Sequence, residues 1–356
     1  MTYASRVQDP DGALAAALAG EVAGVAVATS GSSGEPRLAL VSGGALRASA
    51  EATHERLGGP GRWLLALPPD RIAGAQVLVR SALGGRPAVR LRTGSFDPQA
   101  FAETALATRA DTPASVPLYV SLVPTQLHRI ADDPGAAPAL EAFGAILVGG
   151  AAFRGEGAPP NVIETYGSTE TAGGCVYDGR PLPGVAVNTD VDGRILVSGR
   201  VLFDGYADDG DDGTIVRDGV RWLRMPDAGE FAGARLAVLG RADDVIVTGA
   251  FKVHPATVER ALLALPEIAD AVVVAAADEE WGERIVAVVT LADRRAPIAV
   301  EAVRARLGPA LPRHALPRQV LVVESLPLLD SGKIDRGAAR ALARASSGGS
   351  RARDEA

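Results

Sequence analysis

The sequence predicts an α/β fold: a large αβ-layered amino-terminal domain with a β-rich segment, followed by a small α+β domain. Short apolar runs alternate with Ala-rich helical stretches in the first half of the chain, and this alternation favours helices layered on a sheet. From about Gly184 to Leu239 the pattern changes to short strands and tight turns, and after Gly240 it changes again to helix, strand, strand, helix. We therefore expect a large domain at 1–240, a small domain at 241–345 and a disordered tail at 346–356.

The strands expected in the first half are apolar runs bounded by Gly, Pro or Ser. They lie at 24–29, 63–68, 87–93, 121–125 and 144–150. Two helices are expected between them. One covers 49–59, with Ser49 as N-cap and Gly58 near its carboxyl end, and the other opens at Asp97 with Pro98 in its first turn.

The second half contains one stretch that allows two interpretations. The acidic run 208–212 (DDGDD) suggests a calcium loop, but the further ligand spacing is missing, so a hairpin turn is the better interpretation. Beyond Gly240, helices are expected in 254–268 and 298–308, with two strands in 270–292. With 356 residues and 47% hydrophobic content, the chain can form two cores.

Composition restricts the class of partner. A net charge of -7 gives no basic footprint, so nucleic acid and anionic membranes are not the expected partners, and small metabolites are. A single cysteine, Cys175, excludes an internal disulfide, and the four histidines lack zinc-type spacing. The first residues do not resemble a secretory signal, and no apolar run has membrane-spanning length. We expect a cytoplasmic protein.

The first candidate site is the stretch Thr29–Arg37, TSGSSGEPR, which follows an apolar run. Backbone amides around Gly31 and Gly34, hydroxyl groups and a closing cation can surround a polyphosphate. No Gly-Lys-Ser/Thr follows, so this is not a Walker loop. Taken alone, a surface turn explains the stretch equally well.

A second candidate is the segment 161–174, NVIETYGSTETAGG. Tyr166 offers a flat face for a base, Thr169 a hydroxyl group for phosphate, and Glu170 a hard oxygen ligand for Mg²⁺. The alternative is a helix N-cap followed by an acid in the first turn.

Two further segments carry single chemical groups. Asp227 in PDAGEF can accept both hydroxyls of a ribose, and Arg241 in GRADD can reach sugar or phosphate. Lys333 follows Gly332 on a Pro- and Gly-marked loop in LPLLDSGKIDR. Each of these residues alone is commonplace on a protein surface.

Together and in this order, the motifs TSGSSGEPR, YGSTE, PDAGEF, GRADD and SGKIDR resemble those of the adenylate-forming superfamily of acyl-CoA synthetases, adenylation domains and luciferases. The resemblance covers about residues 24–340. It implies ATP-dependent adenylation of a carboxylic acid, followed by transfer of the acyl group to a thiol, with ATP, Mg²⁺ and CoA as the implied cofactors and co-substrate.

The resemblance also implies residue roles. The ATP phosphates would be held by Thr29, Ser30, Gly31, Ser32, Ser33, Gly34 and Arg37, and the adenine site would be lined by Gly149, Gly150, Ala151, Tyr166 and Gly167. Thr169 would touch the α-phosphate and Glu170 would bind Mg²⁺. The remaining roles are those of Asp227 and Arg241 at the ribose, Asp243 as the hinge of a mobile lid, Gly249 beside the pantetheine arm of CoA, and Lys333 as the catalytic cation.

Within the superfamily the chain resembles shortened o-succinylbenzoate–CoA ligases of menaquinone biosynthesis, because its phosphate loop begins at residue 29 and no full front subdomain precedes it. That substrate has a second carboxylate, for which Arg80 is the candidate cation; a structural arginine is the alternative. Ser121, Thr125 and Gly144 are candidate pocket neighbours. The exposed flank left at the front suggests a homodimer.

Several residues depart from the family pattern. Arg37 replaces a lysine, Pro226 replaces a hydroxyl residue or Gly before the ribose aspartate, and Ala250 replaces a second glycine after Gly249. Asp70 and Arg71 stand where a His or aromatic residue is common, which affects acyl specificity more than adenylation. The competing hypotheses are a ligase for another aryl or fatty acid, an adenylation enzyme that loads a carrier protein, and a non-catalytic nucleotide-binding paralogue.

Overall fold

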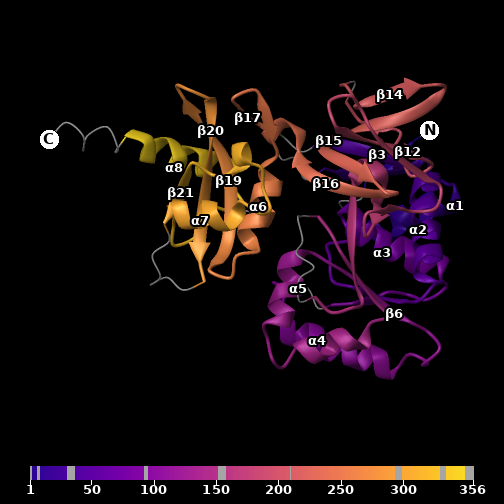
Figure 1. Cartoon of the computed structure of the whole chain (residues 1–356). Helices are drawn as coiled ribbons and strands as arrows, with labels where there is room; N and C mark the ends of the chain where they lie inside the picture. The colour runs from indigo at the N-terminus through magenta and orange to yellow at the C-terminus, as the bar shows by residue number, and fades with distance from the viewer. Residues whose placement is uncertain are drawn as a thin grey trace. The chain divides into compact units, whose positions relative to one another are not determined.

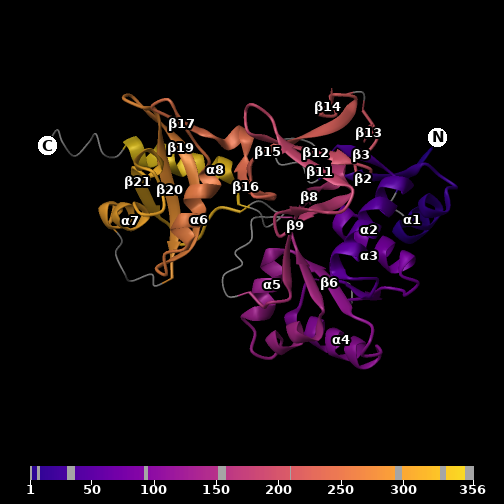
Figure 2. The same cartoon turned by 45° about the vertical axis from the view of Figure 1, so that its right-hand side comes forward.

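The computed structural model describes residues 2–5, 9–29, 37–91, 95–150, 158–208, 210–292, 299–328 and 334–348. The chain divides into two compact units (Figures 1 and 2). The first comprises Met1–Asn188, Leu196–Met225 and Phe231–Ala237, and the second comprises Thr189–Ile195, Pro226–Glu230 and Val238–Ala356. The predicted domain boundary at residue 240 lies within the strand β16 (Arg235–Arg241).

A seven-stranded sheet forms the centre of the first unit, in the order β10-β9-β8-β7-β6-β4-β5. The five strands from β8 to β5 are parallel, and β9 and β10 are antiparallel additions at one edge. The strands are β4 (Arg62–Leu65), β5 (Val89–Arg90), β6 (Leu118–Leu122), β7 (Ala145–Val148), β8 (Val162–Ser168), β9 (Gly173–Tyr177) and β10 (Arg180–Pro181).

Helices cover both faces of this sheet because successive strand residues point to opposite sides. Trp63 and Leu147 face a core that includes Ala52 and Val77 from two of the helices. Neighbouring strand residues such as Leu64 and Ile146 face the other core. The first face carries α2 (Gly43–Leu57) and α3 (Ile72–Leu83), and the second carries α4 (Pro98–Ala110), α5 (Pro124–Ala131) and the 3-10 helix η1 (Ala137–Ala142), as Figures 1 and 2 show.

A four-stranded sheet, β1-β2-β3-β13, lies in the same unit beside the helix α1 (Pro10–Ala19). Its strands are β1 (Tyr3–Ser5), β2 (Gly24–Ala28), β3 (Leu38–Ser42) and β13 (Gly205–Tyr206). The β-rich segment supplies another sheet, with β11 (Val185–Thr189), β12 (Arg194–Gly199), β14 (Thr214–Arg217), β15 (Val220–Ala232) and β16. This segment matches the short strands and turns expected there.

The second unit contains a sheet of its own, ordered β18-β17-β20-β19, with β21 beside β20. Helix α6 packs on one face with α7, and α8 packs on the other, so the unit has two small cores. Its elements are η3 (Ala242–Asp244), β17 (Ile246–Thr248), β18 (Phe251–Val253), α6 (Pro255–Leu263), β19 (Ile268–Asp278), β20 (Gly282–Leu291), α7 (Val300–Leu307), η4 (Arg313–Ala315), β21 (Gln319–Val322) and α8 (Arg336–Gly348).

Some element boundaries differ from the expectation. Helix α2 begins at Gly43 with Ser42 as its N-cap, because the Ser42 side chain accepts from the Ala45 amide; Ser49 is buried inside the helix. Gly58 does close this helix in the left-handed conformation. The strand expected at 121–125 lies at 118–122, since Pro124 opens α5.

Two other differences concern the later part of the chain. Of the acidic run 208–212, residue 209 lies outside the described residues; β13 and β14 on either side of the run belong to different sheets, so the expected hairpin is not formed. Helix α8 continues to Gly348, past the expected start of the tail at 346. No described helix is long and apolar enough to cross a membrane.

Candidate functional site

The carboxyl end of the parallel sheet brings together the residues predicted to line the adenine site. Gly149 and Gly150 follow β7, and the Gly149 amide donates to the Leu122 carbonyl of β6. A Cβ on Gly149 would lie 2.4 Å from Oγ1 of Thr165, so only glycine allows this close approach to β8. Tyr166 comes next on β8 and is half-buried. Ligands of parallel α/β sheets bind at this end of the strands.

The segment after Tyr166 turns sharply and presents Thr169 and Glu170. Gly167 lies against β9, where a Cβ would be 2.2 Å from the Gly173 carbonyl oxygen. Residues Thr169–Thr171 form the single 3-10 turn η2, and the Ser168 amide donates to Oγ1 of Thr171 at 2.8 Å. Ser168 stands at the N-cap position of this turn, but its hydroxyl makes no cap hydrogen bond among the described residues and no α-helix follows, so the expected helix N-cap is only partly realised. Glu170 is half-buried.

Arg37 closes the base of the predicted phosphate loop. Its amide donates to Oγ1 of Thr29 at 3.2 Å, and its carbonyl accepts from the Thr29 amide at 2.8 Å. Its guanidinium makes three hydrogen bonds to the protein: Nε and Nη2 donate to the two carboxylate oxygens of Asp208, and Nη1 donates to the Asp211 carbonyl. The Arg37 guanidinium lowers the pKa of Asp208 below its ordinary value.

Tyr206 connects Arg37 to Glu170. The Tyr206 hydroxyl donates to Oε1 of Glu170 at 2.7 Å, and the guanidinium carbon of Arg37 lies 3.5 Å from the centre of the Tyr206 ring. Burial, and then the neighbouring Glu170 carboxylate, raise the pKa of Tyr206, so its hydroxyl stays protonated and acts as the donor. The sequence analysis missed Tyr206 and Asp208; the signal available was the aromatic residue beside an acidic turn in GYADDG.

The donor set at Glu170 fits a magnesium ion that arrives with a nucleotide. Among the described residues, no cluster of three or more acidic, His or Cys side chains forms a cage. Mg²⁺ in nucleotide sites is held by one or two carboxylates, phosphate oxygens and water. Glu170 supplies one such carboxylate, and the neighbouring Ser168 hydroxyl is buried without a hydrogen-bond partner among the residues that the structure describes. Both features suit a metal-phosphate ligand more than a permanent metal site.

Arg80 lies in the interior, on α3, and is only 3% exposed. Its Nη2 donates to the Tyr177 hydroxyl at 3.3 Å, and its guanidinium carbon lies 5.1 Å from the Trp63 ring centre. Nε of Arg80 and Nε2 of His54 are both buried without a hydrogen-bond partner in the described part of the chain. Burial lowers the pKa of Arg80. No described carboxylate forms an ion pair with Arg80, so its charge is uncompensated here.

The other three candidate pocket residues lie at different places. Ser121 is 7% exposed on β6, and Thr125 is exposed in the first turn of α5, so both are near the carboxyl end of the sheet. Gly144 precedes β7 at the opposite, amino end, where its amide donates to the Leu118 carbonyl. A Cβ there would meet the Pro117 side chain at 3.2 Å. The assignment of Gly144 as a pocket neighbour of Ser121 and Thr125 is therefore corrected: this glycine serves packing.

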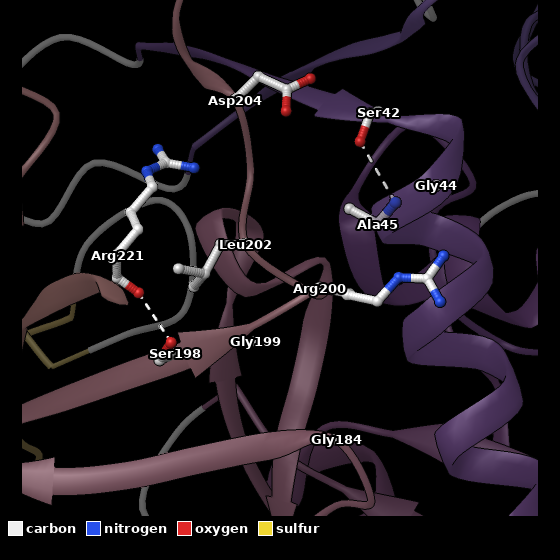
Figure 3. Close-up of a pocket in the computed structure, with 10 residues that line it drawn as sticks. All are labelled: Ser42, Gly44, Ala45, Gly184, Ser198, Gly199, Arg200, Leu202, Asp204 and Arg221. Carbon is white, nitrogen blue, oxygen red and sulfur yellow. Dashed lines mark hydrogen bonds between the residues drawn. The ribbon is translucent and has the colours of Figure 1, made fainter. Parts of the chain in front are cut away.

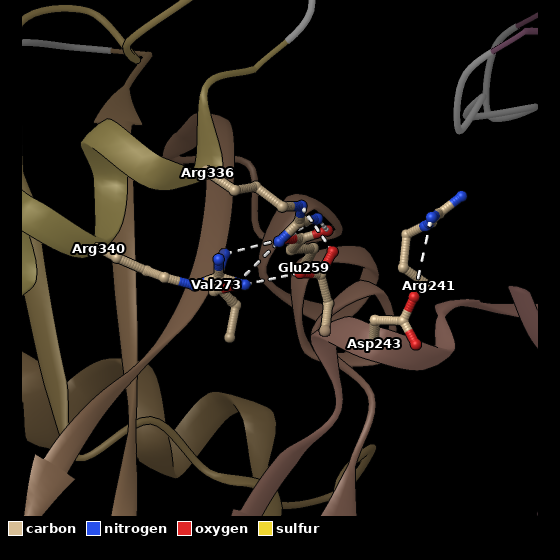
Figure 4. A network of polar contacts seen from close by, with 7 residues as sticks. Arg241, Asp243, Glu259, Val273, Arg336 and Arg340 are labelled. Carbon is tan, nitrogen blue, oxygen red and sulfur yellow. Dashed lines mark hydrogen bonds and ion pairs between the residues drawn. The ribbon is translucent and has the colours of Figure 1, made fainter. Parts of the chain in front are cut away.

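In the second unit, the predicted hinge Asp243 is held by two cations. Arg194 Nη2 donates to Oδ1 of Asp243 at 2.5 Å, and Arg241 lies 3.9 Å from its Oδ2. Figure 4 shows Arg241 and Asp243 side by side on the segment that includes η3. Asp227, the predicted ribose ligand, is half-buried on β15.

A half-buried ion network lies beside the predicted hinge (Figure 4). Arg336, in the first turn of α8, binds both oxygens of Glu259 at 2.8 and 3.0 Å and lies 3.6 Å from Asp244. Arg340 donates to Asp244 at 2.6 Å, and Glu259 also accepts from the Val273 amide. The network fixes the start of α8 against η3, α6 and β19.

Gly249 and Ala250 form the two-residue loop between β17 and β18, in which Thr248 pairs with Phe251. Both loop residues have positive φ, 52° and 68°, as a type I′ turn requires. The Trp281 ring packs on Gly249, where a Cβ would lie 2.4 Å from a ring carbon. Ala250 therefore adopts a conformation that favours the glycine usual in the family pattern.

Several predicted residues lie outside the described part of the chain. They are Ser30, Gly31, Ser32, Ser33, Gly34, Ala151 and Lys333. Their roles remain predictions.

The first unit also has a concave region of about 500 Å³ that contains none of the predicted residues. Figure 3 shows Arg200 beside the first turn of α2, and Arg221 across the cavity near Leu202 and Asp204. Ser198 Oγ donates to the Arg221 carbonyl at 2.7 Å. Arg221 Nη1 in turn donates to the Phe203 carbonyl. This bond links the Arg221 side of the cavity to the segment that leads to Tyr206.

Known proteins resemble the chain over most of its length. Residues 257–333 match the AMP-binding enzyme C-terminal domain. A protein of Mycobacterium tuberculosis named a probable 2-succinylbenzoate–CoA ligase is 40% identical over 321 residues, which cover 88% of this chain and 82% of that protein. The chain belongs to the adenylate-forming AMP-binding enzymes.

Two solved structures of this family agree with the fold. Both are of o-succinylbenzoate CoA synthetase from Bacillus subtilis. The complex with the acyl-adenylate intermediate OSB-AMP is 26% identical, with a TM-score of 0.72 over 88% of this chain and 68% of that chain. The complex with ATP and magnesium ion is 25% identical, with a TM-score of 0.74 over 88% and 69% of the two chains. These matches confirm the α/β fold and the family expected from the motifs.

Proposed function

We propose that the protein is an o-succinylbenzoate–CoA ligase, an AMP-forming acid–thiol ligase that uses ATP, Mg²⁺ and CoA in menaquinone biosynthesis. The observation that carries this proposal is the 40% identity to a protein named 2-succinylbenzoate–CoA ligase, extending over 88% of this chain. Three residues at the carboxyl end of the sheet support it: Gly149 and Tyr166, which would line the adenine site, and the half-buried Glu170.

The chemistry follows from the charges of the reactants. A carboxylate oxygen of the succinyl group attacks the α-phosphorus of ATP and pyrophosphate leaves, so two anions must approach each other. Mg²⁺, when bound, neutralises phosphate charge. In this proposal Glu170 holds the metal, Thr169 contacts the α-phosphate, Thr29 and Arg37 bind the outer phosphates, and Lys333 bridges the carboxylate and the α-phosphate.

The second half-reaction needs access for a thiol. The CoA sulfur attacks the acyl carbon of the adenylate, AMP leaves, and a thioester forms. We propose that Gly249 lies beside the pantetheine arm, Asp243 acts as the hinge of the second unit, and Asp227 and Arg241 bind the ribose. Only a residue without a side chain leaves room at Gly249 next to the Trp281 ring.

Arg80 is the proposed partner of the second carboxylate of the substrate. It is a buried cation with an unpartnered Nε and no described carboxylate beside it. A buried charge without a counterion is costly, and an anionic ligand would remove that cost. Ser121 and Thr125 are proposed to line the acyl pocket at the carboxyl end of the sheet, whereas Arg80 packs on Trp63 near the amino end of β4.

Acid-dependent ATP/pyrophosphate exchange, followed by addition of CoA, tests the proposal directly. We expect exchange with o-succinylbenzoate, then release of AMP and formation of the thioester when CoA is added. A Lys333→Ala variant is expected to lose exchange while it still binds ATP. A strong response to a fatty acid with none to o-succinylbenzoate would disprove the choice of substrate.

One observation favours a second candidate, a CoA ligase or carrier-loading enzyme for another acid. Asp70 and Arg71 are exposed just before α3, where the family pattern has a His or aromatic residue. A panel of aryl and fatty acids in the exchange assay separates the two, because only the rival predicts a preferred acid with a single carboxylate.

A homodimer belongs to the proposal as well. It is supported by an open cavity of about 510 Å³ in the first unit, with Leu14, Leu18 and Leu78 in its lining. Analytical sedimentation at micromolar protein concentration tests the homodimer, and finding only monomer would rule the homodimer out. Cytoplasmic localisation is also proposed, and cell fractionation tests it.

A further inference from the structure

Tyr206 contacts two groups that the proposed function assigns to the nucleotide phosphates and their metal ion. Its hydroxyl donates to Glu170, the proposed metal ligand, at 2.7 Å. Its ring lies flat beneath Arg37, the cation at the base of the phosphate loop, with the guanidinium carbon 3.5 Å from the ring centre. One side chain therefore sets the separation of an anion and a cation that must both face ATP.

The backbone fixes Tyr206 from two directions. On one side Tyr206 pairs with Ala39 in the β13–β3 ladder, and the Ala207 amide donates to the Leu38 carbonyl, next to Arg37. On the other side the Phe203 amide donates to the carbonyl of Glu170 at 2.9 Å. The short segment 203–207 thus joins the base of the phosphate loop directly to the metal-binding turn.

Packing around the ring supports the same arrangement. Phe203 is fully buried and meets the Tyr206 ring edge-on, with ring centres 5.0 Å apart. Arg221 holds the Phe203 carbonyl at 2.7 Å, and Figure 3 shows Arg221 across from Asp204, the residue between Phe203 and Gly205. Tyr206 has little freedom to turn its hydroxyl away from Glu170.

This geometry also explains why residue 37 is an arginine. A guanidinium is planar, so it can stack on an aromatic ring while its edge donates to a carboxylate in two bonds and to a carbonyl in a third. Arg37 makes all of these contacts, with Tyr206, Asp208 and Asp211. A lysine ammonium has no plane and could not make them together. The arginine that replaces the usual lysine therefore suits the contacts with Tyr206 and Asp208.

We propose that Tyr206 is a positioning residue for metal-dependent nucleotide binding, holding the Glu170 carboxylate in place and coupling it to Arg37. The proposal rests on the function inferred above, and it adds a residue to which neither the motifs nor the relatives' names assign a role. Tyr206 does not touch the reacting atoms; it acts through the orientation of Glu170.

The test is the Mg²⁺ dependence of ATP binding in a Tyr206→Phe variant, measured by calorimetry with ATP as the probe. Phenylalanine keeps the ring, and so the stack with Arg37, and removes only the hydroxyl. We expect the affinity gain that Mg²⁺ gives to ATP to fall about tenfold, as for loss of a hydrogen bond to a charged group. ATP affinity in EDTA and the melting temperature should change little.

Tyr119→Phe is the matched control in the same unit. The Tyr119 hydroxyl donates to the Leu57 carbonyl at 3.2 Å and to the Gly59 carbonyl at 3.4 Å, in the core between α2 and the sheet, so the variant also loses a hydroxyl donor. Its Mg²⁺ dependence should equal that of the parent. An unchanged Mg²⁺ dependence in Tyr206→Phe, or an equal loss in Tyr119→Phe, would overturn the proposal.

A second variant, Arg37→Lys, keeps the positive charge but removes the stack and the paired bonds to Asp208. Arg37 is itself a proposed phosphate ligand, so its replacement is expected to lower ATP affinity in EDTA as well. The readout is therefore the ratio of the ATP affinities with and without Mg²⁺, which should again fall because Tyr206 loses one of its two anchors. If Tyr206→Phe fails to fold, this result decides the proposal alone. Calorimetry needs no acid substrate, so failure of o-succinylbenzoate to react overturns the proposed function and leaves this measurement valid.

Discussion

At the scale of single residues, the most informative group is a buried cation without a buried anion. Arg80 has one neutral hydrogen-bond partner, Tyr177, and an aromatic face, Trp63. Buried arginines usually have a carboxylate partner, because desolvation of an unpaired charge is costly. On this ground we propose that Arg80 is a specificity residue, and a structural arginine is the alternative.

Replacing Arg80 with methionine should affect one substrate class only. We expect Arg80→Met to lower kcat/KM for o-succinylbenzoate about 30-fold, because a charge-assisted contact to its aromatic carboxylate is lost. 4-Oxo-4-phenylbutanoate, which lacks that carboxylate, should react as well as with the parent. Steady-state kinetics with the two acids check this, and an equal loss for both would make Arg80 structural.

Burial of His54 predicts a pH dependence of stability. Desolvation, and then the charge of Arg80, lower the pKa of His54 below its ordinary value of 6.5. The unfolded chain therefore takes up a proton first as the pH falls, so the free energy of unfolding decreases below about pH 6.5. His254 in the second unit has a lowered pKa for the same main reason and adds to this loss.

His54→Asn should make the unfolding free energy decrease less steeply as the pH falls. Melting temperatures from about pH 8 to about pH 5.5 measure it, and the exposed His128 provides the control, His128→Asn. An identical decline in His54→Asn and the parent would contradict a buried neutral His54.

At the scale of elements, the β17–β18 loop contains a measurable local strain. Ala250 has a φ of 68°, in the left-handed region that costs an L residue about 1 kcal/mol. Ala250→Gly relieves this strain but increases the entropy of the unfolded chain, and the first effect should prevail. We expect the second unit to gain up to about 1 kcal/mol of stability. Denaturant unfolding followed by Trp281 fluorescence measures it; a loss of stability would show that Ala250 is unstrained.

The elements also show what the sequence could predict. Asp97 with Pro98, and Gly58 as a C-cap, mark helix ends by local chemistry, and both were predicted correctly. The start of α2 was missed because GGALR contains two poor helix formers, and tertiary packing of Gly43 against the Ala17 carbonyl compensates. Gly144 was misplaced because a run of apolar residues does not reveal which end of the strand meets a ligand.

The residues of the candidate site also fall into two groups, those that sequence reasoning could place together and those that it could not. Gly149 follows β7, Tyr166 lies near the end of β8 and Glu170 follows β8, so their clustering could be anticipated from motif order and the family resemblance. Tyr206 and Asp208 could not, because they reach Arg37 through a pairing of β13 with β3 across more than 160 positions of the chain. Such long-range contacts leave no local pattern in the sequence.

At the scale of the whole molecule, the two compact units have separate cores. The second unit has its own buried run along β20, including Val286 and Val288. We expect calorimetry to resolve two melting transitions. Val288→Ala should lower only one of them, by about 2 kcal/mol of unfolding free energy. Trp281 fluorescence assigns that transition to the second unit, and a single transition shifted as a whole would indicate one cooperative unit.

The contact between Arg37 and Asp208 has a consequence for how the enzyme meets its nucleotide. Three of the five N–H donors of the Arg37 guanidinium bind Asp208 and Asp211, which leaves one donor on Nη1 and one on Nη2 for a further acceptor. If Arg37 binds a phosphate group as proposed, that group meets Arg37 beside the Asp208 carboxylate and is repelled by its charge. An inhibitor with a neutral acceptor at this position would avoid that repulsion.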